Sequence, residues 1–224
     1  MKNKILFALT SHNQKGNSGQ ATGFYLAEAS HPWAVLKSAG FEIDFVSPQG
    51  GQPPMDGVDM EDAINRRFLE DSDVTKKMRN TPTPAQLNAA DYAAIFFVGG
   101  HGTMWDFPDD ESLAKLTTTI YENGGVVSAV CHGPAALINL KLANGDYLVK
   151  GKKVAAFTDD EERAVKLDTV VPFMLATTLC QRGAQHVAAP NWQANVMVDG
   201  RLVTGQNPAS AEGVGREVAR LLRT

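Results

Sequence analysis

A short apolar run that ends in a cysteine constrains the fold of this chain more than any other stretch. Residues 126–130 read Val-Val-Ser-Ala-Val, a composition typical of a strand buried on both faces of a parallel sheet. Pro134 has a fixed φ that suits the first turn of a helix, which residues up to Leu140 can continue. Cys131 is therefore predicted to lie at a strand-to-helix corner.

A corner of this kind pushes one side chain out of the sheet and over the N-terminus of the following helix. The partial positive charge there stabilises a thiolate and lowers the pKa of a cysteine. Taken alone, Cys131 would be interpreted as a buried cysteine at the end of a core strand. The continuation Cys131-His132-Gly133-Pro134 favours a nucleophile instead.

Continuously apolar strands alternate with helical segments along the chain, which predicts an α/β fold. We expect a three-layer sandwich in one domain spanning 1–224, with an open, mostly parallel sheet and helices on both faces. Residues 52–90 interrupt the alternation and are interpreted as a small insertion that serves as a lid, a dimer contact or structural cover. The predicted strands are 5–10, 41–46, 92–98, 126–130, one or two within 147–157, and a hairpin at 195–204 with an Asp-Gly turn.

Composition excludes several classes of protein. The net charge of −4 is spread along the chain without a basic stripe, which argues against nucleic acid as a partner. Cys131 and Cys180 are too few for a secreted disulfide framework, so a reduced cytoplasmic setting is expected. The apolar run near the N-terminus is too short for a signal peptide, and no stretch approaches the length of a membrane span.

A second glycine-rich corner follows the strand predicted at 92–98. Gly99 to Gly102 and the Cys131 corner both lie at carboxyl ends of strands, so the two are expected at the same edge of the sheet, where such folds bind ligands. The backbone N–H groups of Gly100 and His132 could then form an oxyanion hole. Considered alone, the glycines would indicate only an ordinary tight turn.

A histidine that acts as a base needs an acid to orient it. The acidic cluster Asp159 to Glu162 supplies candidates for a partner of His132, although most of such a cluster is expected to be a solvated helix start. Glu28 lies early in a helix predicted to begin at Phe24, and Pro32 would break or kink that helix. The irregularity fits a carboxylate aimed at the site, and an exposed acid fits equally well.

Other polar and aromatic residues are interpreted more simply. His12, His31 and His101 fall in three segments without the spacing of metal ligands. His101 is a candidate for shaping the pocket. Trp105 is a candidate either for the pocket or for a dimer seam. A helix predicted over 168–182 would bury Cys180 in its apolar face.

These pieces combine into a specific pattern that covers nearly the whole chain. The chain resembles the ThiJ/PfpI superfamily, and within it the Hsp-chaperone-like branch that includes the glutathione-independent glyoxalases (glyoxalase III). The segments that carry the resemblance are Glu28 before His31-Pro32, Phe45 to Gly51, Gly99 to Gly102, Trp105 to Pro108, Ala129 to Pro134, Gly151 to Thr158 and Val203 to Ser210.

The resemblance implies roles for individual residues. Cys131 matches the family nucleophile, and Glu28 matches the acid that hydrogen-bonds the cysteine and handles a proton. His132 matches the triad histidine. Glu162 matches the acid that orients it, although Glu161 stands beside it.

The resemblance also implies a fold and a reaction. The family fold is flavodoxin-like and commonly dimeric, and its glyoxalase reaction needs no metal or organic cofactor. The implied function is a lyase that converts methylglyoxal or a similar 2-oxoaldehyde to a 2-hydroxy acid through a hemithioacetal on Cys131, with Glu28 and His132 moving protons. The same site would release early glycation adducts, so the expected partner is a small 2-oxoaldehyde or a glycated protein.

Other classes of protein share parts of the pattern. A class I glutamine amidotransferase takes its histidine from a downstream His-x-Glu pair, and the one later histidine here, His186, has no such acid. An intracellular protease or amidase-like hydrolase stays open, as does a stress-response holdase or redox-sensing protein. Oxidation of Cys131 without turnover of dicarbonyls would indicate the redox sensor.

Overall fold

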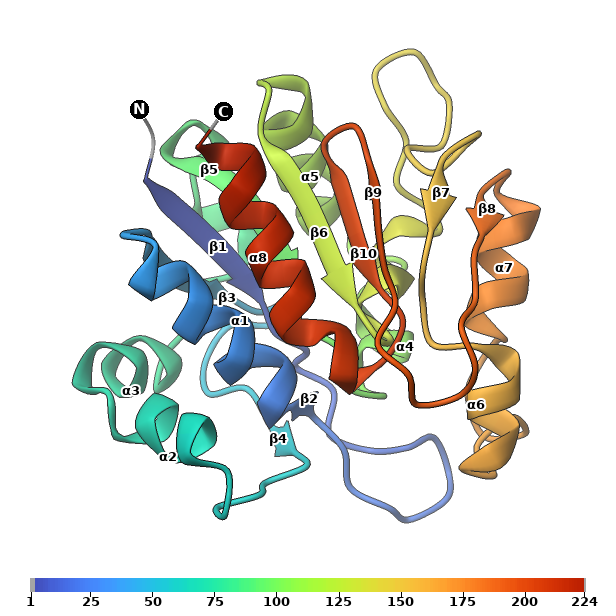
Figure 1. The fold of residues 1–224 in the computed structure, drawn as a ribbon, viewed down its shortest axis with the longest axis horizontal. Coiled ribbons are helices and arrows are strands. Elements are labelled where there is room, and N and C mark those ends of the chain that lie inside the picture. Colours follow the sequence, from blue (N-terminus) through green and yellow to red (C-terminus); the bar gives the residue numbers. More distant parts are fainter. Residues whose placement is uncertain (1–2, 224) are drawn as a thin grey trace.

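A mixed, mostly parallel sheet forms the centre of the computed structural model, which describes residues 3–223 (Figure 1). Within those residues, six strands pair in the order β3-β1-β5-β6-β10-β9. All neighbours in this order are parallel except β10 and β9, which form the predicted antiparallel hairpin. The strands are β1 (Lys4–Ala8), β3 (Glu42–Val46), β5 (Tyr92–Phe97), β6 (Val126–Val130), β9 (Val196–Asp199) and β10 (Leu202–Gly205).

Both faces of the sheet are buried, which explains why its strands are apolar without interruption. In β1, Ile5 and Phe7 belong to the core on one face, and Leu6 and Ala8 belong to the core on the other. All four side chains are inaccessible to solvent. Successive residues of a strand point to opposite faces, so a strand covered on both sides must be apolar at every position.

Helices cover the two faces and give the predicted three layers (Figure 1). Helices α1 and α8 pack together over one face, and α5 packs against β5 and β6 on the other. In residues 3–223, no helix combines the length and apolar character needed to cross a lipid bilayer. The longer helices are α1 (Leu26–Ser38), α2 (Ala63–Glu70), α3 (Ser72–Met78), α5 (Glu111–Glu122), α7 (Leu175–Gln181) and α8 (Ala211–Leu222), and the shorter ones are α4 (Thr103–Asp106) and α6 (Asp159–Ala164).

The segment 52–90 packs beside the main sheet as predicted. It contains α2, which contacts α1, and α3, which contacts β3. Its first strand, β4 (Met55–Asp56), pairs with β2 (Phe24–Tyr25) just before α1 begins. Two short 3₁₀ helices, Pro84–Gln86 and Ala89–Asp91, lead back into β5. Most of the segment therefore serves as structural cover.

Local structure differs from the sequence prediction in two of the expected helices. An α-helix was expected after Cys131, but the structure has a 3₁₀ helix there, Gly133–Leu137. The backbone is close-packed at its start, where a Cβ on Gly133 would lie 2.3 Å from the carbonyl oxygen of Phe97. The helix predicted over 168–182 begins at Leu175. Met174 is the N-cap of this helix and has an extended backbone, with φ −83° and ψ 116°.

Pro32 was expected to break or kink its helix, but α1 continues through it. Gly215 of α8 faces this point, and a Cβ there would lie 2.9 Å from the Cα of Pro32. The glycine lets α8 pack closely where α1 lacks a hydrogen bond. The strand prediction within 147–157 is reduced to β7 (Lys153–Val154), which pairs with β8 (Gln185–His186).

The aromatic packing between β1 and β5 should dominate the stability of the α1 and α8 face. The Phe96 ring is fully buried and stacks on Phe7 at a centroid separation of 4.8 Å. Phe96→Ala should lower the free energy of unfolding by about 3–5 kcal/mol in urea titrations, because the cavity cannot collapse between two strands. Val198→Ala on the exposed edge strand β9 is the control and should change it by less than about 0.5 kcal/mol. Equal effects would contradict this account of the core.

Candidate active site

Cys131 lies at a strained corner directly after β6. Its φ is 61°, a left-handed conformation that non-glycine residues rarely adopt. Its N–H donates to the carbonyl oxygen of Gly205, and its own carbonyl oxygen accepts from the N–H of Phe157, each at 2.9 Å. Hydrogen bonds on both sides thus hold the strained residue in place, and strain held in this way is characteristic of functional sites.

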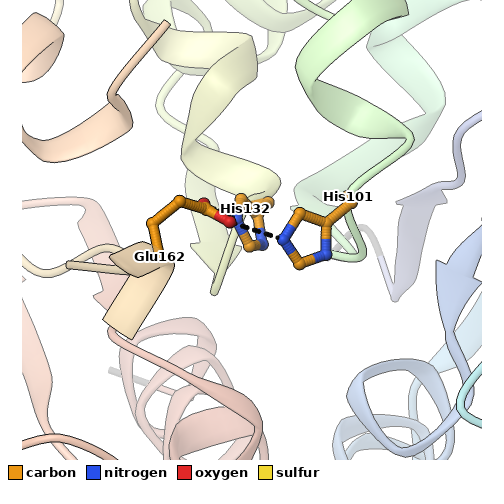
Figure 2. A group of neighbouring side chains, drawn as sticks. All are labelled: His101, His132 and Glu162. Carbon is orange, nitrogen blue, oxygen red and sulfur yellow. Dashed lines mark hydrogen bonds and ion pairs between the residues drawn. The ribbon is translucent and has the colours of Figure 1, made fainter. Parts of the chain in front are cut away.

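Two histidines and one carboxylate form a hydrogen-bonded cluster beside the sulfur (Figure 2). His132 Nδ1 lies 3.4 Å from Cys131 Sγ, and its Nε2 lies 2.7 Å from Glu162 Oε2. The second oxygen of Glu162 lies 2.8 Å from Nε2 of His101. The two imidazole rings are neighbours, with centroids 4.0 Å apart. One carboxylate therefore orients both histidines.

The charges within this cluster follow from burial and hydrogen bonding. Burial alone would raise the pKa of Glu162, but hydrogen bonds from His101 and His132 outweigh it and lower the pKa to about 2. Burial, with the neighbouring His101, lowers the pKa of His132 to about 4. At neutral pH an ionised Glu162 accepts the Nε2–H proton of a neutral His132. The unprotonated Nδ1 of that tautomer faces the Cys131 sulfur.

The start of α6 separates the roles of its two adjacent glutamates. Thr158 caps the helix, and the N–H and the hydroxyl of Thr158 both donate hydrogen bonds to Glu161 Oε2. The other oxygen of Glu161 accepts from the Trp192 N–H and from the side-chain amides of Gln206 and Asn207. Glu161 is thus a structural residue, and Glu162 alone of the two contacts the histidines.

Glu28 lies on the first turn of α1 and is fully buried. Neither carboxyl oxygen has a well-formed hydrogen bond among the described residues. A Cβ on Gly99 would lie 2.2 Å from Glu28 Oε2 and 3.0 Å from Cys131 Cβ, so the carboxyl group and the cysteine share the space beside this glycine. Burial raises the pKa of Glu28 to about 8, against the weaker opposing effects of the Cys131 thiol and the Gly99 N–H. Glu28 is therefore a neutral acid at pH 7.

The pKa of the Cys131 thiol is raised, whereas the sequence analysis expected it to be lowered. Burial, followed by the neighbouring carboxyl groups of Glu28 and Glu162, raises the pKa of Cys131 well above its usual value. The expected α-helix dipole is absent at this corner, where a short 3₁₀ helix stands in its place. The resting group is a thiol whose sulfur lies 3.4 Å from His132 Nδ1, and this base must remove the thiol proton as the sulfur reacts.

The two backbone donors predicted for an oxyanion hole lie at the same edge of the sheet. The His132 N–H points toward the Cys131 sulfur. The Gly100 N–H has no backbone acceptor within residues 3–223. Gly100 has a φ of 106°, and a Cβ there would lie 2.2 Å from the Gly23 carbonyl oxygen, so only glycine fits this turn.

A cavity of about 550 Å³ opens onto these groups. Five of the residues that the sequence analysis singled out line it: Glu28, Gly100, His101, Cys131 and His132. Most of the further lining residues carry no motif signal, although Phe157 and Pro208 lie within segments of the family pattern. These additional residues are Lys15, Gln20, Tyr25, Asp56, Phe157, Val165, Lys166, Leu167, Trp192 and Pro208.

Two sequence candidates lie elsewhere. Trp105 is not among the residues that line the cavity, and its ring stacks on His12 at a centroid separation of 5.1 Å. Cys180 is exposed on α7 rather than buried in an apolar face. The buried face of α7 is formed by Leu175, Ala176 and Leu179 instead.

His101, His132 and Glu162 place one potential metal-ligand atom each within 4.8 Å of one another. Both carboxylate oxygens already accept ring N–H protons, at 2.7 and 2.8 Å. A metal ion would have to displace both protons. The geometry is therefore that of a hydrogen-bonded acid and two imidazoles.

Comparison with known proteins agrees with this geometry. The model of the DJ-1/PfpI family matches residues 20–221. The chain belongs to the DJ-1/PfpI family. The mostly parallel sheet and the corner at Cys131 are thus features of a DJ-1/PfpI protein, and the flavodoxin-like fold predicted from the sequence is confirmed.

Full-length DJ-1/PfpI relatives are similar over nearly the whole chain. "Glutathione-independent glyoxalase HSP31" of Saccharomyces cerevisiae is 38% identical over 224 residues, covering 93% of each chain. The crystal structure of glyoxalase III from Candida albicans superimposes with a TM-score of 0.90 at 33% identity, covering 97% of this chain and 96% of that one. Rapid Encystment Protein 24 KDa of Francisella tularensis superimposes with a TM-score of 0.95 at 40% identity, covering 99% of both.

The buried acid should make the stability of this DJ-1/PfpI protein depend on pH. Between the ordinary pKa of 4.5 and about 8, the native state keeps a proton on Glu28 that the unfolded chain releases. Stability therefore falls as pH rises through that window, by at most about 1.4 kcal/mol per pH unit. Glu28→Gln removes this dependence, so its stability relative to the unmutated protein should rise by about 2–3 kcal/mol from pH 5 to pH 7.5 in urea titrations. A difference that does not change with pH would contradict a neutral Glu28.

Proposed function

We propose that the protein is a glutathione-independent glyoxalase that converts methylglyoxal or a similar 2-oxoaldehyde to a 2-hydroxy acid. The observation that carries this proposal is the Cys131 thiol facing His132 Nδ1, with Glu162 behind the ring and the neutral Glu28 beside the sulfur. The names of the yeast relatives support the same reaction. The reaction needs a nucleophile, a base and an acid, and these groups meet at one cavity.

The first step is addition of the sulfur to the aldehyde carbon. His132 Nδ1 takes the thiol proton as the C–S bond forms, and Glu162 stabilises the imidazolium. Negative charge develops on the former carbonyl oxygen, where the N–H groups of Gly100 and His132 can donate. The His132 imidazolium then returns its proton to that oxygen, which gives the hemithioacetal and leaves His132 neutral. Glu28 is the acid nearest the sulfur and supplies or shares a proton as charge moves there.

The second step moves a hydrogen between the two carbons without any external oxidant. The proton leaves C1, its electron pair forms a C1–C2 double bond, and the C2 carbonyl oxygen becomes an enediolate oxygen. Reprotonation at C2, with transfer of the C1 hydroxyl proton to the C2 oxygen, gives a thioester, so C1 is oxidised while C2 is reduced. Water then adds to the thioester carbon, the C–S bond breaks, and the 2-hydroxy acid leaves with the thiol restored.

The cavity is large for methylglyoxal alone. Its volume is about 550 Å³. A five-heavy-atom substrate would leave most of it empty. This observation favours longer 2-oxoaldehydes or an early glycation adduct on a protein side chain as additional substrates.

The setting of the reaction is part of the same proposal. We place the protein in the cytoplasm as a homodimer. Both cysteines are free thiols in the structure, which suits a reducing compartment. The dimer is supported by the family resemblance.

The core claim predicts that turnover requires Cys131 and no added thiol. Purified protein incubated with methylglyoxal in the absence of glutathione should produce lactate, and Cys131→Ala should abolish it because no C–S bond can form. Cys180→Ala is the matched control and should retain the activity of the unmutated protein, since Cys180 is exposed on α7. Lactate formation by Cys131→Ala at an unchanged rate would overturn the mechanism. A protein that served only as a redox sensor or holdase would form no lactate in any variant.

The orienting acid should matter for turnover more than for substrate binding. Glu162→Gln removes the charge that fixes the His132 tautomer and stabilises the imidazolium, so kcat should fall by about 10²–10⁴-fold. Alkylation of Cys131 by iodoacetamide should slow as well, because the same histidine takes the thiol proton. A variant with unchanged alkylation and turnover would show that Glu162 has no role in activating the sulfur.

A further inference from the structure

His101 has a ring nitrogen that the hydrogen-bond network leaves free. Its Nε2 donates to Glu162 Oε1 at 2.8 Å, which leaves Nδ1 unprotonated in the neutral ring. Nδ1 has no hydrogen-bond partner among the described residues. The ring lines the cavity, and 16% of the side chain is exposed there. Figure 2 shows the two histidine rings side by side, both directed at Glu162.

The other groups at the site that could accept a proton are His132 and Glu28, and neither is free to act on C1. The His132 side chain is 1% exposed. Its Nδ1 contacts the Cys131 sulfur and its Nε2 is hydrogen-bonded to Glu162. Glu28 is neutral at pH 7 and so has no charge with which to abstract a proton. Neither group is suited to remove the C1 proton of a hemithioacetal that extends into the cavity.

We propose that His101 Nδ1 is a second general base, which takes the proton from C1 of the Cys131 hemithioacetal and returns it to C2. This inference rests on the proposed glyoxalase function and assigns the isomerisation step of that reaction. The C1–H bond breaks, its electrons form the C1–C2 double bond, and the C2 carbonyl oxygen becomes an enediolate oxygen, which receives the C1 hydroxyl proton as the thioester forms. His101 then carries the proton as an imidazolium until C2 is reprotonated.

Glu162 is placed to support both histidines in turn. Its Oε2 faces the imidazolium that forms on His132 when sulfur attacks, and its Oε1 faces the imidazolium that forms on His101 when C1 loses its proton. With ring centroids 4.0 Å apart, two simultaneous positive charges would repel strongly. Thiol activation and isomerisation therefore take place one after the other, each neutralised by the same carboxylate.

The test separates isomerisation from thiol activation. In His101→Gln, the side-chain amide can still donate to Glu162, but no basic nitrogen remains. We expect kcat for lactate formation to fall by about 10²–10⁴-fold. The alkylation rate of Cys131 by iodoacetamide should stay within about twofold of the unmutated protein. Added methylglyoxal should still protect Cys131 from alkylation, because the hemithioacetal forms and accumulates.

Deuterium at C1 gives an independent readout. With methylglyoxal deuterated at the aldehyde carbon, the primary isotope effect on kcat should be larger in His101→Gln than in the unmutated protein, since C–H cleavage becomes fully rate-limiting. His31→Gln is the matched control. His31 is paired with Asp62 on α1 and α2 and does not line the cavity, so that variant should behave as the unmutated protein.

Two results would overturn the assignment of His101. One is a kcat within twofold of the unmutated protein. The other is an alkylation rate that falls in the same proportion as kcat, which would show that His101 acts only by positioning Glu162. Should the glutamine variant not fold, His101→Asn is measured with the same readouts and judged by the same results. Absence of lactate formation by the unmutated protein would instead overturn the proposed function itself.

Discussion

The parallel register of β5 and β6 is the constraint on which the site depends. Phe97 pairs with Ala129, so the chain leaves both strands at the same level of the sheet. That pairing brings the Gly99–Gly100 turn so close to Cys131 that a Cβ on Gly99 would lie 3.0 Å from the Cys131 Cβ. A slip of one residue would reverse the faces of every side chain in the strand. The reactive corner is therefore set by backbone pairing before any polar contact is considered.

Two glutamates at this edge of the sheet show how environment decides protonation. Glu162 accepts hydrogen bonds from two ring N–H groups and stays ionised, with a pKa of about 2. Glu28 is buried without a well-formed partner among the described residues and holds its proton up to a pKa of about 8. The two carboxyl groups thus offer a fixed negative charge and a neutral acid at the same pH. Paired groups with opposed pKa shifts are a common basis for acid and base catalysis.

Much of this arrangement could be predicted from the sequence because it depends on local pattern. The apolar run before Cys131, the glycine corner at Gly99 and the Asp-Gly hairpin each have a direct structural meaning. The corner geometry follows from them, and so does the shared edge of the sheet. The alternation of strands and helices was sufficient to predict the three layers.

The remaining features depend on contacts between distant segments. The sequence has no signal that His101 shares Glu162 with His132, since 61 residues separate His101 from Glu162. The shift of the Cys131 pKa was predicted in the wrong direction, because burial and two carboxyl groups replace the expected helix dipole. Pro32 was expected to break or kink α1, but the helix continues through it, with Gly215 of α8 packed against it. Loop residues such as Trp192 reach the cavity only through tertiary packing.

The adjacency of Glu161 and Glu162 carries a consequence for how such chains can diverge. One glutamate holds the Trp192 loop and the Gln206-Asn207 segment, while its neighbour faces the two imidazoles. An insertion or deletion of a single residue in this turn would shift both glutamates by one position and remove both sets of hydrogen bonds together. Substitutions on the exposed surface of α6 should therefore be tolerated among relatives, whereas insertions or deletions in its first turn should not. Among homologues, the spacing from the Thr158 cap to each acid should be a better guide to its role than the presence of acidic residues in the segment.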